Sequence, residues 1–472
     1  MSEQTAADQP RTESHDPAVP AAYAAFMREG WGDRELDLPR SSVAEPAARR
    51  RAALAALFPG ERLVLPAGGF KVRANDTDYR FRPDTAHTYY AGNQTSDAVL
   101  VVHDDQHVLY ARPRASRETD EFFRDRQYGE LWAGRRPSAH EISSALGLEV
   151  RHIDQLADDL RASSPKTRVH RGVSAAVDAL VEGDASLDAD LARVVSEQRL
   201  IKDAWEIAQL EEACAITAAG FEDCVREWPR VLEYGERWIE GTFFRRARTQ
   251  GNDIGYDSIV AGGAHATTLH WIENSGPITP GQLVLLDMGV ENRQLYTADI
   301  TRTIPVDGRF TDLQRRLYEL VLAAQEAGIA AVRPGVPFAS VHEASMTVLA
   351  HGLEDMGLLP VSAEEALDPE SKVYARWTLH GTSHMLGMDV HDCGQAAPES
   401  YAKGELAEGM VLTVEPGLYF QADDLLVPEE LRGIGIRIED DVQVTADGAR
   451  NLSAALPRTV ADIEEWMGRL IG

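Results

Sequence analysis

The sequence has few cysteines and no long apolar run. Its three cysteines, Cys214, Cys224 and Cys393, are an odd number without a C-x-x-C spacing, so neither a disulfide framework nor a thiolate zinc site is expected. No stretch approaches the roughly 18 apolar residues that span a bilayer. The N-terminal residues also lack the apolar segment of a secretory signal. These absences predict a cytoplasmic protein that has no membrane as a partner.

Positive charge is also scarce, because 47 Lys and Arg face 76 Asp and Glu, for a formal net charge of −29. Nucleic acids and anionic membranes bind patches of Lys and Arg, so we expect no nucleic acid as a partner. The chain has no P-loop, and Gly433-Ile-Gly435 lacks the third glycine of a dinucleotide loop. Ser383 lies outside a G-x-S-x-G motif, so a serine nucleophile is not indicated.

The 472 residues allow two or more domains with full-sized cores. Residues 1–45 are polar, acidic and rich in Pro and Ala, which predicts a disordered or loosely docked arm. An α/β N-terminal domain and its connection are predicted over 46–195. Within it, two apolar runs in Asp97–Pro113 flank an Asp-Asp turn and indicate a β-hairpin. The predicted C-terminal domain, 196–472, begins with an amphipathic helix over Ile201–Val225.

Local signals predict further elements in this order along the chain. Polar residues at 182–198 indicate the connection between the domains. Two more helices are predicted from capping boxes, one at Thr311 and Gln314 and the other at Ser340 and Glu343.

An internal repeat is the most informative pattern. Residues 281–289 (GQLVLLDMG) and 409–417 (GMVLTVEPG) both consist of glycine, a spacer, four mostly apolar residues, an acid, a spacer and glycine. Each predicts a buried strand that ends in a carboxylate, Asp287 or Glu415. A second strand follows each, and these carry Asp299 and Glu439. Duplicated strand pairs imply a pseudo-symmetric sheet with a carboxylate cluster at its centre.

Four buried carboxylates require positive charge, since each costs several kcal/mol unless it is paired or binds a metal. The same strands hold only two cations, Arg302 and Arg437. Two divalent ions roughly 3.5–4 Å apart would satisfy the acids better and form a known hydrolytic arrangement. The oxygen-rich set favours Mn²⁺, with Co²⁺, Fe²⁺ or Zn²⁺ as alternatives. The competing interpretation is that Asp287 and Glu415 are ordinary strand-end residues in solvent.

Residues 380–392 (HGTSHMLGMDVHD) hold three of the 14 histidines. The spacing of His380 and His384 suits one face of a helix, but the glycines in this stretch disfavour a helix through it. Histidines also cluster by chance. Beside a carboxylate cluster, one histidine would complete the metal set. The other two, together with His270 in ATTLHWIEN, would hold substrate or transfer protons.

Residues from about 200 to 460 resemble the pita-bread metallopeptidases, the family of methionine aminopeptidase, prolidase and aminopeptidase P. The resemblance rests on six segments that follow one another in family order. They are LHWIEN, LVLLDMG, YTADITRT, HGTSHMLGMDVHD, VLTVEPGLY and GIRIEDDV.

This resemblance implies a set of site residues. Asp299 and Glu439 would bridge two divalent metal ions. Asp287 and Asp299 are twelve residues apart where eleven are expected, and we expect the extra residue in the turn around ENRQ. Substrate and proton-transfer roles are implied for three histidines, and Arg437 is implied to lie beside the bridging glutamate. The five implied metal ligands are Asp287, Asp299, His384, Glu415 and Glu439, and the three histidines are His270, His380 and His391.

Two segments of the N-terminal half, NDTDYRFRPDTAHTYYAGNQTSDAVLVV and ELWAGRRPS, resemble the creatinase-like domain of aminopeptidase P. The expected fold class is therefore α/β (α+β), with a creatinase-like N-terminal domain followed by a pita-bread catalytic domain. The resemblance implies a metallo-aminopeptidase that releases the N-terminal residue from peptides with proline second. Glu415 would accept a proton, and His391 would polarise the scissile carbonyl.

Three alternatives remain open at this point. The first is prolidase, which cleaves Xaa-Pro dipeptides and has nearly the same catalytic motifs. The others are a metal-free enzyme of this fold, such as creatinase, and a binding protein with an inactive pita-bread domain. The complete ligand set argues against the last two. We also expect a homo-oligomer, either a dimer or a tetramer.

Overall fold

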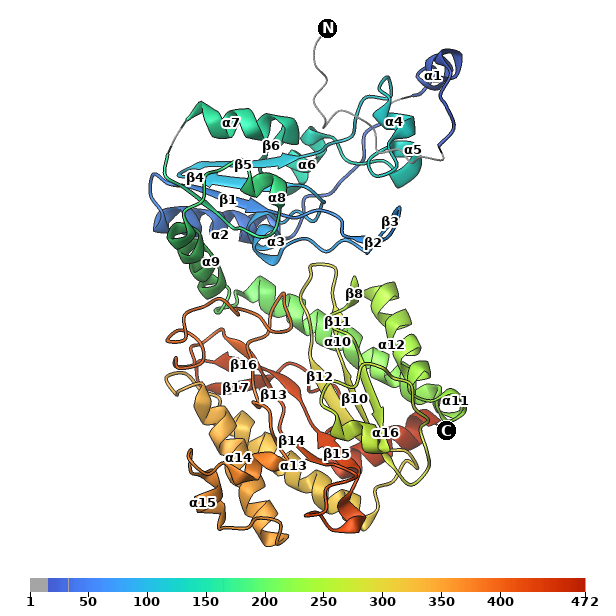
Figure 1. Ribbon diagram of the computed structural model, residues 1–472, viewed down its shortest axis with the longest axis vertical. Helices are drawn as coiled ribbons and strands as arrows, with labels where there is room; N and C mark the ends of the chain where they lie inside the picture. The colour runs from blue at the N-terminus through green and yellow to red at the C-terminus, as the bar shows by residue number, and fades with distance from the viewer. Residues whose placement is uncertain (1–15, 33, 164, 472) are drawn as a thin grey trace. The chain divides into compact units, whose positions relative to one another are not determined.

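The chain divides into two compact units, Met1–Val195 and Ser196–Gly472. The computed structural model describes residues 16–32, 34–163 and 165–471. Both units mix helices and strands, as the ribbon shows (Figure 1). Among the described residues, no helix combines the length and apolar character needed to cross a membrane.

A five-stranded sheet with the order β6-β5-β4-β1-β7 forms the centre of the first unit. The predicted hairpin is confirmed. Its strands pair antiparallel, and the turn contains Asp104, whose φ of +47° places it in the left-handed region. One face of the sheet packs Val64, Val99 and Val101 against Leu156 and other apolar residues that follow the strands. The strands are β1 (Arg62–Pro66), β4 (Val99–His103), β5 (Gln106–Ala111), β6 (Glu149–His152) and β7 (Thr167–Val169), with a short pair of β2 (Val72–Ala74) and β3 (Thr77–Asp78) outside the sheet.

Short helices surround this sheet. The α2 and α3 helices contact each other and also contact β4. The connection predicted over 182–198 is itself helical, because Leu191 and Val195 are four residues apart and are both buried. The helices of this part of the chain are α2 (Ala44–Leu57), α3 (Thr85–Ala91), α4 (Glu121–Arg124), α5 (Glu130–Ala133), α6 (Ala139–Leu146), α7 (Leu156–Ala162), α8 (Ala175–Asp178) and α9 (Ala185–Gln198).

The predicted N-terminal arm lies in part outside the described residues, which begin at residue 16. Between residues 16 and 45, the α1 helix (Ala21–Met27) contains no buried residue. Ion pairs join Asp16 to Arg126 and Arg28 to Asp120. The described part of the arm is therefore docked on its own unit through these ion pairs and through edge-to-face contacts of Tyr23 with Phe123 and of Trp31 with Phe122.

The second unit contains the two strand pairs that the repeat predicts. β10 pairs antiparallel with β12, and β13 pairs antiparallel with β16. The prediction of one pseudo-symmetric sheet is wrong, because these pairs belong to separate sheets, ordered β12-β10-β9 and β13-β16-β17. The strands are β8 (Asp253–Ile254), β9 (Ile259–Gly262), β10 (Leu283–Met288), β11 (Val290–Glu291), β12 (Ile300–Pro305), β13 (Val411–Val414), β14 (Gly417–Phe420), β15 (Ile434–Arg437), β16 (Asp440–Thr445) and β17 (Gly448–Asn451).

The separation has a local cause. The segment expected to be one strand is interrupted at Glu439, so that β15 pairs with β14 while β16 pairs with β13. At this interruption the Glu439 N–H donates to the carbonyl of Thr301, over 3.1 Å, and the Arg437 N–H donates to the Thr303 hydroxyl. The two halves thus meet at β12 through a few hydrogen bonds instead of a continuous ladder.

Helices pack against both strand pairs, with α10 against α12 and α13 against α14 (Figure 1). The predicted capping box at Thr311 and Gln314 is confirmed at the start of α13. The predicted box at Ser340 is wrong, because α14 already begins at Ala339 and its first turn has no side-chain cap. The helices are α10 (Ala204–Arg226), α11 (Trp228–Tyr234), α12 (Glu236–Gln250), α13 (Asp312–Ala331), α14 (Ala339–Asp355), α15 (Ala363–Leu367) and α16 (Val460–Ile471).

Candidate metal centre and active site

One cavity of the second unit, with a volume of about 750 Å³, gathers every site residue that the sequence indicated. Carboxylates, histidines and one arginine line its polar part. Apolar side chains, among them Ile259, Leu269 and Val390, line the rest. The predicted residues in its wall are His270, Asp287, Asp299, His380, His384, His391, Glu415, Arg437 and Glu439.

The four acids converge because each lies in or next to the end of a strand. Asp287 is the fifth residue of β10, and Asp299 directly precedes β12. Glu415 directly follows β13, and Glu439 occupies the interruption between β15 and β16. The apolar residues before each acid are buried, so the backbone carries each carboxylate to the cavity from the core.

The turn between Asp287 and Asp299 is closed by its own side chains. Asn292 accepts hydrogen bonds through Oδ1 from the backbone N–H of Gln294 and of Tyr296. Leu295 takes a φ of +65° within this turn.

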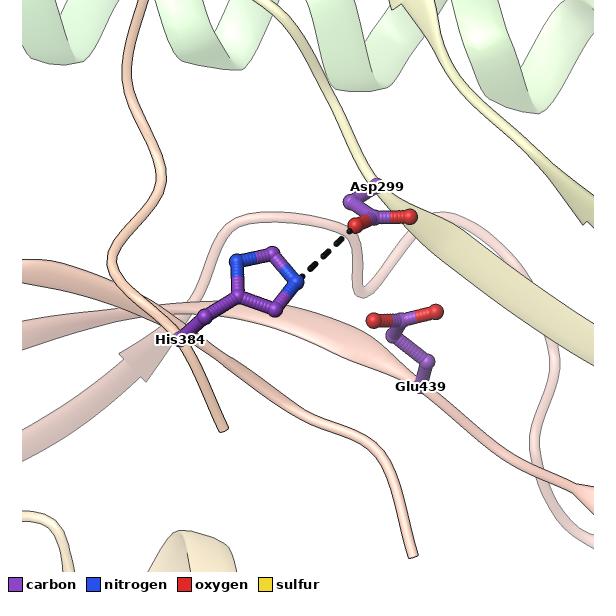
Figure 2. Close-up of side chains that lie close together, drawn as sticks. All are labelled: Asp299, His384 and Glu439. Atoms are coloured by element: carbon purple, nitrogen blue, oxygen red, sulfur yellow. Dashed lines mark ion pairs between the residues drawn. The ribbon is translucent and has the colours of Figure 1, made fainter. Parts of the chain in front are cut away.

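His384 reaches the acids from an extended segment that runs beside β13. Its carbonyl accepts from the N–H of Thr413, and Nδ1 lies 3.2 Å from the carbonyl of Met385. A proton on Nδ1 leaves Nε2 directed at the carboxylates, 3.3 Å from Oδ2 of Asp299 and 3.7 Å from Oε1 of Glu415. Figure 2 shows this ring edge facing Asp299, with Glu439 beside both.

In this cluster, burial and the mutual repulsion of the carboxylates disfavour the negatively charged form of the acids. Burial raises the pKa of Glu415 to about 7, with help from the charges of Asp299 and Asp287 and against the opposing charges of His384 and Arg437. Burial raises the pKa of Glu439 well above its usual value, and the neighbouring carboxylates add to this. Burial would lower the pKa of His384, but its hydrogen bond to Asp299 and the nearby negative charges raise it to about 9.

These shifts are those of a site built for cations. One ligand atom each of Asp299, His384 and Glu439 lies within 4.8 Å of the other two, a spacing that can hold a metal ion (Figure 2). The donor set is oxygen-rich with one imidazole, which suits Mn²⁺, Fe²⁺, Co²⁺ or Zn²⁺.

Two side chains donate hydrogen bonds to the carboxylate of Asp287. Tyr256 donates its hydroxyl to Oδ1 over 2.6 Å, and Arg437 donates from Nη2 to Oδ2 over 2.5 Å. Arg437 was expected beside Glu439, but its carboxylate partner is Asp287. The hydroxyl of Thr301 links it to Glu439, because this hydroxyl accepts from Arg437 Nε and donates to Glu439 Oε2. No motif in the sequence indicated Tyr256 as a site residue.

A hydrogen-bonded chain runs from Arg437 to His380. Arg437 Nη1 donates to the Tyr419 hydroxyl over 3.0 Å, and this hydroxyl lies 2.8 Å from His380 Nε2. His380 Nδ1 lies 2.8 Å from the carbonyl of Gly381, so its proton is held there. Burial and the charge of Arg437 lower the pKa of His380 to about 3, which keeps the imidazole neutral.

The other two histidines differ in their surroundings. His391 lies edge-on to His384, with ring centroids 4.4 Å apart. Burial lowers the pKa of His391, and the charge of His384 lowers it further. His270 is exposed at the cavity wall, in the segment between β9 and β10.

A buried network behind the acids was not predicted from the sequence. Arg302 pairs with Asp440 over 2.7 Å and also donates to the carbonyl of Glu439. Asp441 accepts from the backbone N–H of Asp299 and from the thiol of Cys214. Asp440 and Asp441 directly follow Glu439 in GIRIEDDV, so the motif that predicted the ligand also contained its support.

Two strand pairs that present four carboxylates to a cavity, with histidines opposite, define a metal-dependent hydrolase of the pita-bread class. The chain belongs to metallopeptidase family M24, which matches residues 208–446. Residues 47–170 match the family described as aminopeptidase P, N-terminal domain. The predicted family and fold class are confirmed, and the family implies the use of divalent metal ions.

Relatives cover nearly the whole chain. Xaa-Pro aminopeptidase 1 of Streptomyces coelicolor is 52% identical over 463 residues, which are 97% of this chain and 94% of the relative. Xaa-Pro aminopeptidase of Escherichia coli is 33% identical over 89% of this chain and 96% of its own. The solved structure of Pseudomonas aeruginosa aminopeptidase PepP has a TM-score of 0.81 at 31% identity and covers 92% of this chain and 99% of its own.

Proposed function

We propose that this protein is a metallo-aminopeptidase that releases the N-terminal residue from peptides with proline at the second position. The observation that carries the proposal is the single cavity that holds five candidate metal ligands and three further histidines. The names of the relatives, which match this chain over nearly its full length, support the same activity. They do not favour the prolidase alternative.

The ligands that we propose are the five that the sequence indicated, and the metal that we propose is a pair of Mn²⁺ ions. The family resemblance implies that Asp299 and Glu439 would be shared by the pair, and one oxygen of each lies in the cluster with His384. When bound, two such ions lower the pKa of a water molecule and polarise a carbonyl group. The ligands would be Asp287, Asp299, His384, Glu415 and Glu439.

Side chains of the cavity wall would transfer protons and bind the substrate. Glu415 accepts the proton of the attacking water, because its carboxylate faces the cavity beside His384. His391 donates a hydrogen bond to the oxygen of the scissile carbonyl, and this bond strengthens as negative charge develops there. His270 and His380 line the side that receives proline. Both ring nitrogens of His380 are engaged by Gly381 and Tyr419, so we propose that His380 shapes this side by contact.

The choice between aminopeptidase and prolidase depends on the substrate carboxylate. A dipeptidase must anchor the free carboxylate of proline, and a fixed arginine does this best. Arg437 is the one arginine or lysine in the described cavity wall, and Asp287 and Tyr419 already occupy its Nη atoms. The second arginine near the acids, Arg302, is committed to Asp440. The described cavity therefore offers no unoccupied cation for a proline carboxylate.

The test compares a Xaa-Pro-Xaa tripeptide with the matching Xaa-Pro dipeptide, with Mn²⁺ supplied. We expect a higher kcat/KM for the tripeptide and for longer peptides. A preference for the dipeptide with the tripeptide uncleaved would assign the protein to prolidase. The arm at 1–45, the domains at 46–195 and 196–472, a homo-oligomeric state and a cytoplasmic location stay predictions.

A further inference from the structure

Glu236, the first residue of α12, is a fully buried carboxylate outside the metal cluster. Among the described residues, no lysine or arginine pairs with it. Its oxygens instead accept four hydrogen bonds, all from the segment that carries His270. The donors are Gly262 N–H (2.8 Å), His265 Nδ1 (2.7 Å), Trp271 Nε1 (3.0 Å) and Gly276 N–H (2.6 Å).

These donors bracket His270 on both sides. Gly262 is the last residue of β9, Trp271 directly follows His270, and Gly276 lies five residues beyond Trp271. The Glu236 N–H also donates to the Gly276 carbonyl, over 3.0 Å. One carboxylate and its own backbone therefore fix the start, the middle and the end of the segment 262–276, which we call the His270 loop.

Close packing holds this arrangement. The rings of His265 and Trp271 stack with centroids 3.9 Å apart, so the two side-chain donors support each other. A Cβ atom on Gly276 would lie 2.4 Å from the His265 ring, which means that only glycine allows the loop to approach this closely. Asn274 adds a further anchor, since it bonds to the backbone of Val260 and Ser258.

The imidazole of His270 has no comparable support of its own. None of the residues that the structure describes forms a hydrogen bond with its ring, and the side chain is exposed at the cavity wall. Its position therefore follows the backbone of the loop. A catalytic or substrate-binding group must be held within a fraction of an ångström, because a displacement of about 1 Å can cost on the order of 100-fold in rate.

We propose that Glu236 is a positioning residue that places His270 at the substrate side of the cavity through these four hydrogen bonds. This inference rests on the proposed function, because it assigns His270 to the same reaction. Replacing Glu236 by Gln keeps the size of the side chain but turns one acceptor oxygen into a donor NH₂ group. At least one of the four donors then loses its partner, and the His270 loop loosens.

The test is a double-mutant cycle between Glu236→Gln and His270→Ala, measured as kcat and KM for a Xaa-Pro-Xaa tripeptide with Mn²⁺ supplied. We expect Glu236→Gln to lower kcat/KM roughly tenfold in the wild-type background and less than about twofold in the His270→Ala background. Metal content should match the wild type in both. Hydrogen–deuterium exchange should rise within residues 262–276.

Glu141→Gln is the matched control. Glu141 is also a buried glutamate that accepts backbone hydrogen bonds, but it lies in the first unit. The Glu141→Gln substitution should lower thermal stability without raising hydrogen–deuterium exchange in the His270 loop. If Glu236→Gln does not fold, Trp271→Phe removes one donor while it keeps a ring beside His265, and it should show the same coupling to His270→Ala.

The outcomes separate the two proposals. Wild-type protein that leaves the tripeptide uncleaved overturns the proposed function, and the exchange measurement then still tests the role of Glu236. Equal loss from Glu236→Gln in both backgrounds overturns the positioning role while the proposed function stands. Loss of metal in Glu236→Gln also overturns it.

Discussion

Arg437 donates a hydrogen bond to Asp287 across 2.5 Å, although the two residues lie 150 positions apart in the chain. Both are buried, and Arg437 also donates to Tyr419 and to Thr301. One guanidinium therefore orients a candidate metal ligand and, through Tyr419, the neutral imidazole of His380. A planar group with several donors can do this, whereas an ammonium group cannot reach all three partners at once.

Arg437→Lys should lower kcat/KM by about 10- to 100-fold, the usual range for a group that orients a metal ligand. In this variant Asp287 should bind metal less tightly. Part of the loss should therefore be recovered at high Mn²⁺ concentration. Arg450→Lys is the control, since Arg450 pairs with Glu211 at exposed positions. Titration of activity with Mn²⁺ decides the matter, and a curve that matches the wild type would contradict the role of Arg437.

Replacing a proposed bridging ligand should differ from replacing a terminal one. Asp299→Ala and Glu439→Ala should lose both metal ions and all measurable activity, whereas Asp287→Ala should keep about one ion per chain. Elemental analysis of the purified variants measures this directly. Two ions retained in Asp299→Ala would show that Asp299 does not bridge.

His391→Ala should keep its metal content and lose kcat by roughly 100- to 1,000-fold, because His391 is proposed to act on charge that develops in the transition state. KM should change much less than kcat. Metal analysis and steady-state kinetics on the same preparation provide the test. Loss of metal, or near-normal turnover, would remove His391 from the proposed role.

Asp392 anchors the segment that carries His384 and His391. It is buried and pairs with Arg199 over 3.0 Å and with Lys202 over 3.5 Å. Asp392→Asn removes the buried charge that Arg199 and Lys202 share, so we expect a loss of about 3–5 kcal/mol in the free energy of unfolding. Asp389→Asn is the matched control, because Asp389 is half-buried and lies 4.0 Å from the same arginine. Urea unfolding of both variants measures the difference. Equal free energies of unfolding would contradict the anchoring role of Asp392.

Removal of the metal should make stability depend on pH. In the metal-free protein, the pKa of Glu415 rises from 4.5 to about 7 and that of His384 from 6.5 to about 9. A raised folded-state pKa contributes stability that is complete below the unfolded pKa and is lost as the pH rises through the folded pKa. The Tm of EDTA-treated protein should therefore fall between about pH 4.5 and 9. Added Mn²⁺ should raise the Tm most at the upper end of this range. A flat profile without metal would contradict this account.

The sequence predicted the local features that depend on a few adjacent residues. The hairpin of Asp97–Pro113 followed from two apolar runs around a turn, and the start of α13 followed from its capping box. The box at Ser340 failed because the same spacing also occurs inside a helix, and only the position of Ala339 in α14 shows which case applies.

The repeated motif indicated Asp287 and Glu415 at strand ends, because an acid after a buried apolar run is a property of adjacent residues. The strand that follows each copy carries Asp299 or Glu439. The motif did not determine how the strand pairs are joined. Whether they form one sheet or two depends on the interruption at Glu439, whose N–H finds its acceptor in Thr301, 138 positions earlier in the chain. Likewise, Tyr256 and Glu236 lie outside every motif that the sequence analysis identified. Each gains its role from a hydrogen-bond partner distant in sequence, and only the tertiary structure brings such partners within reach.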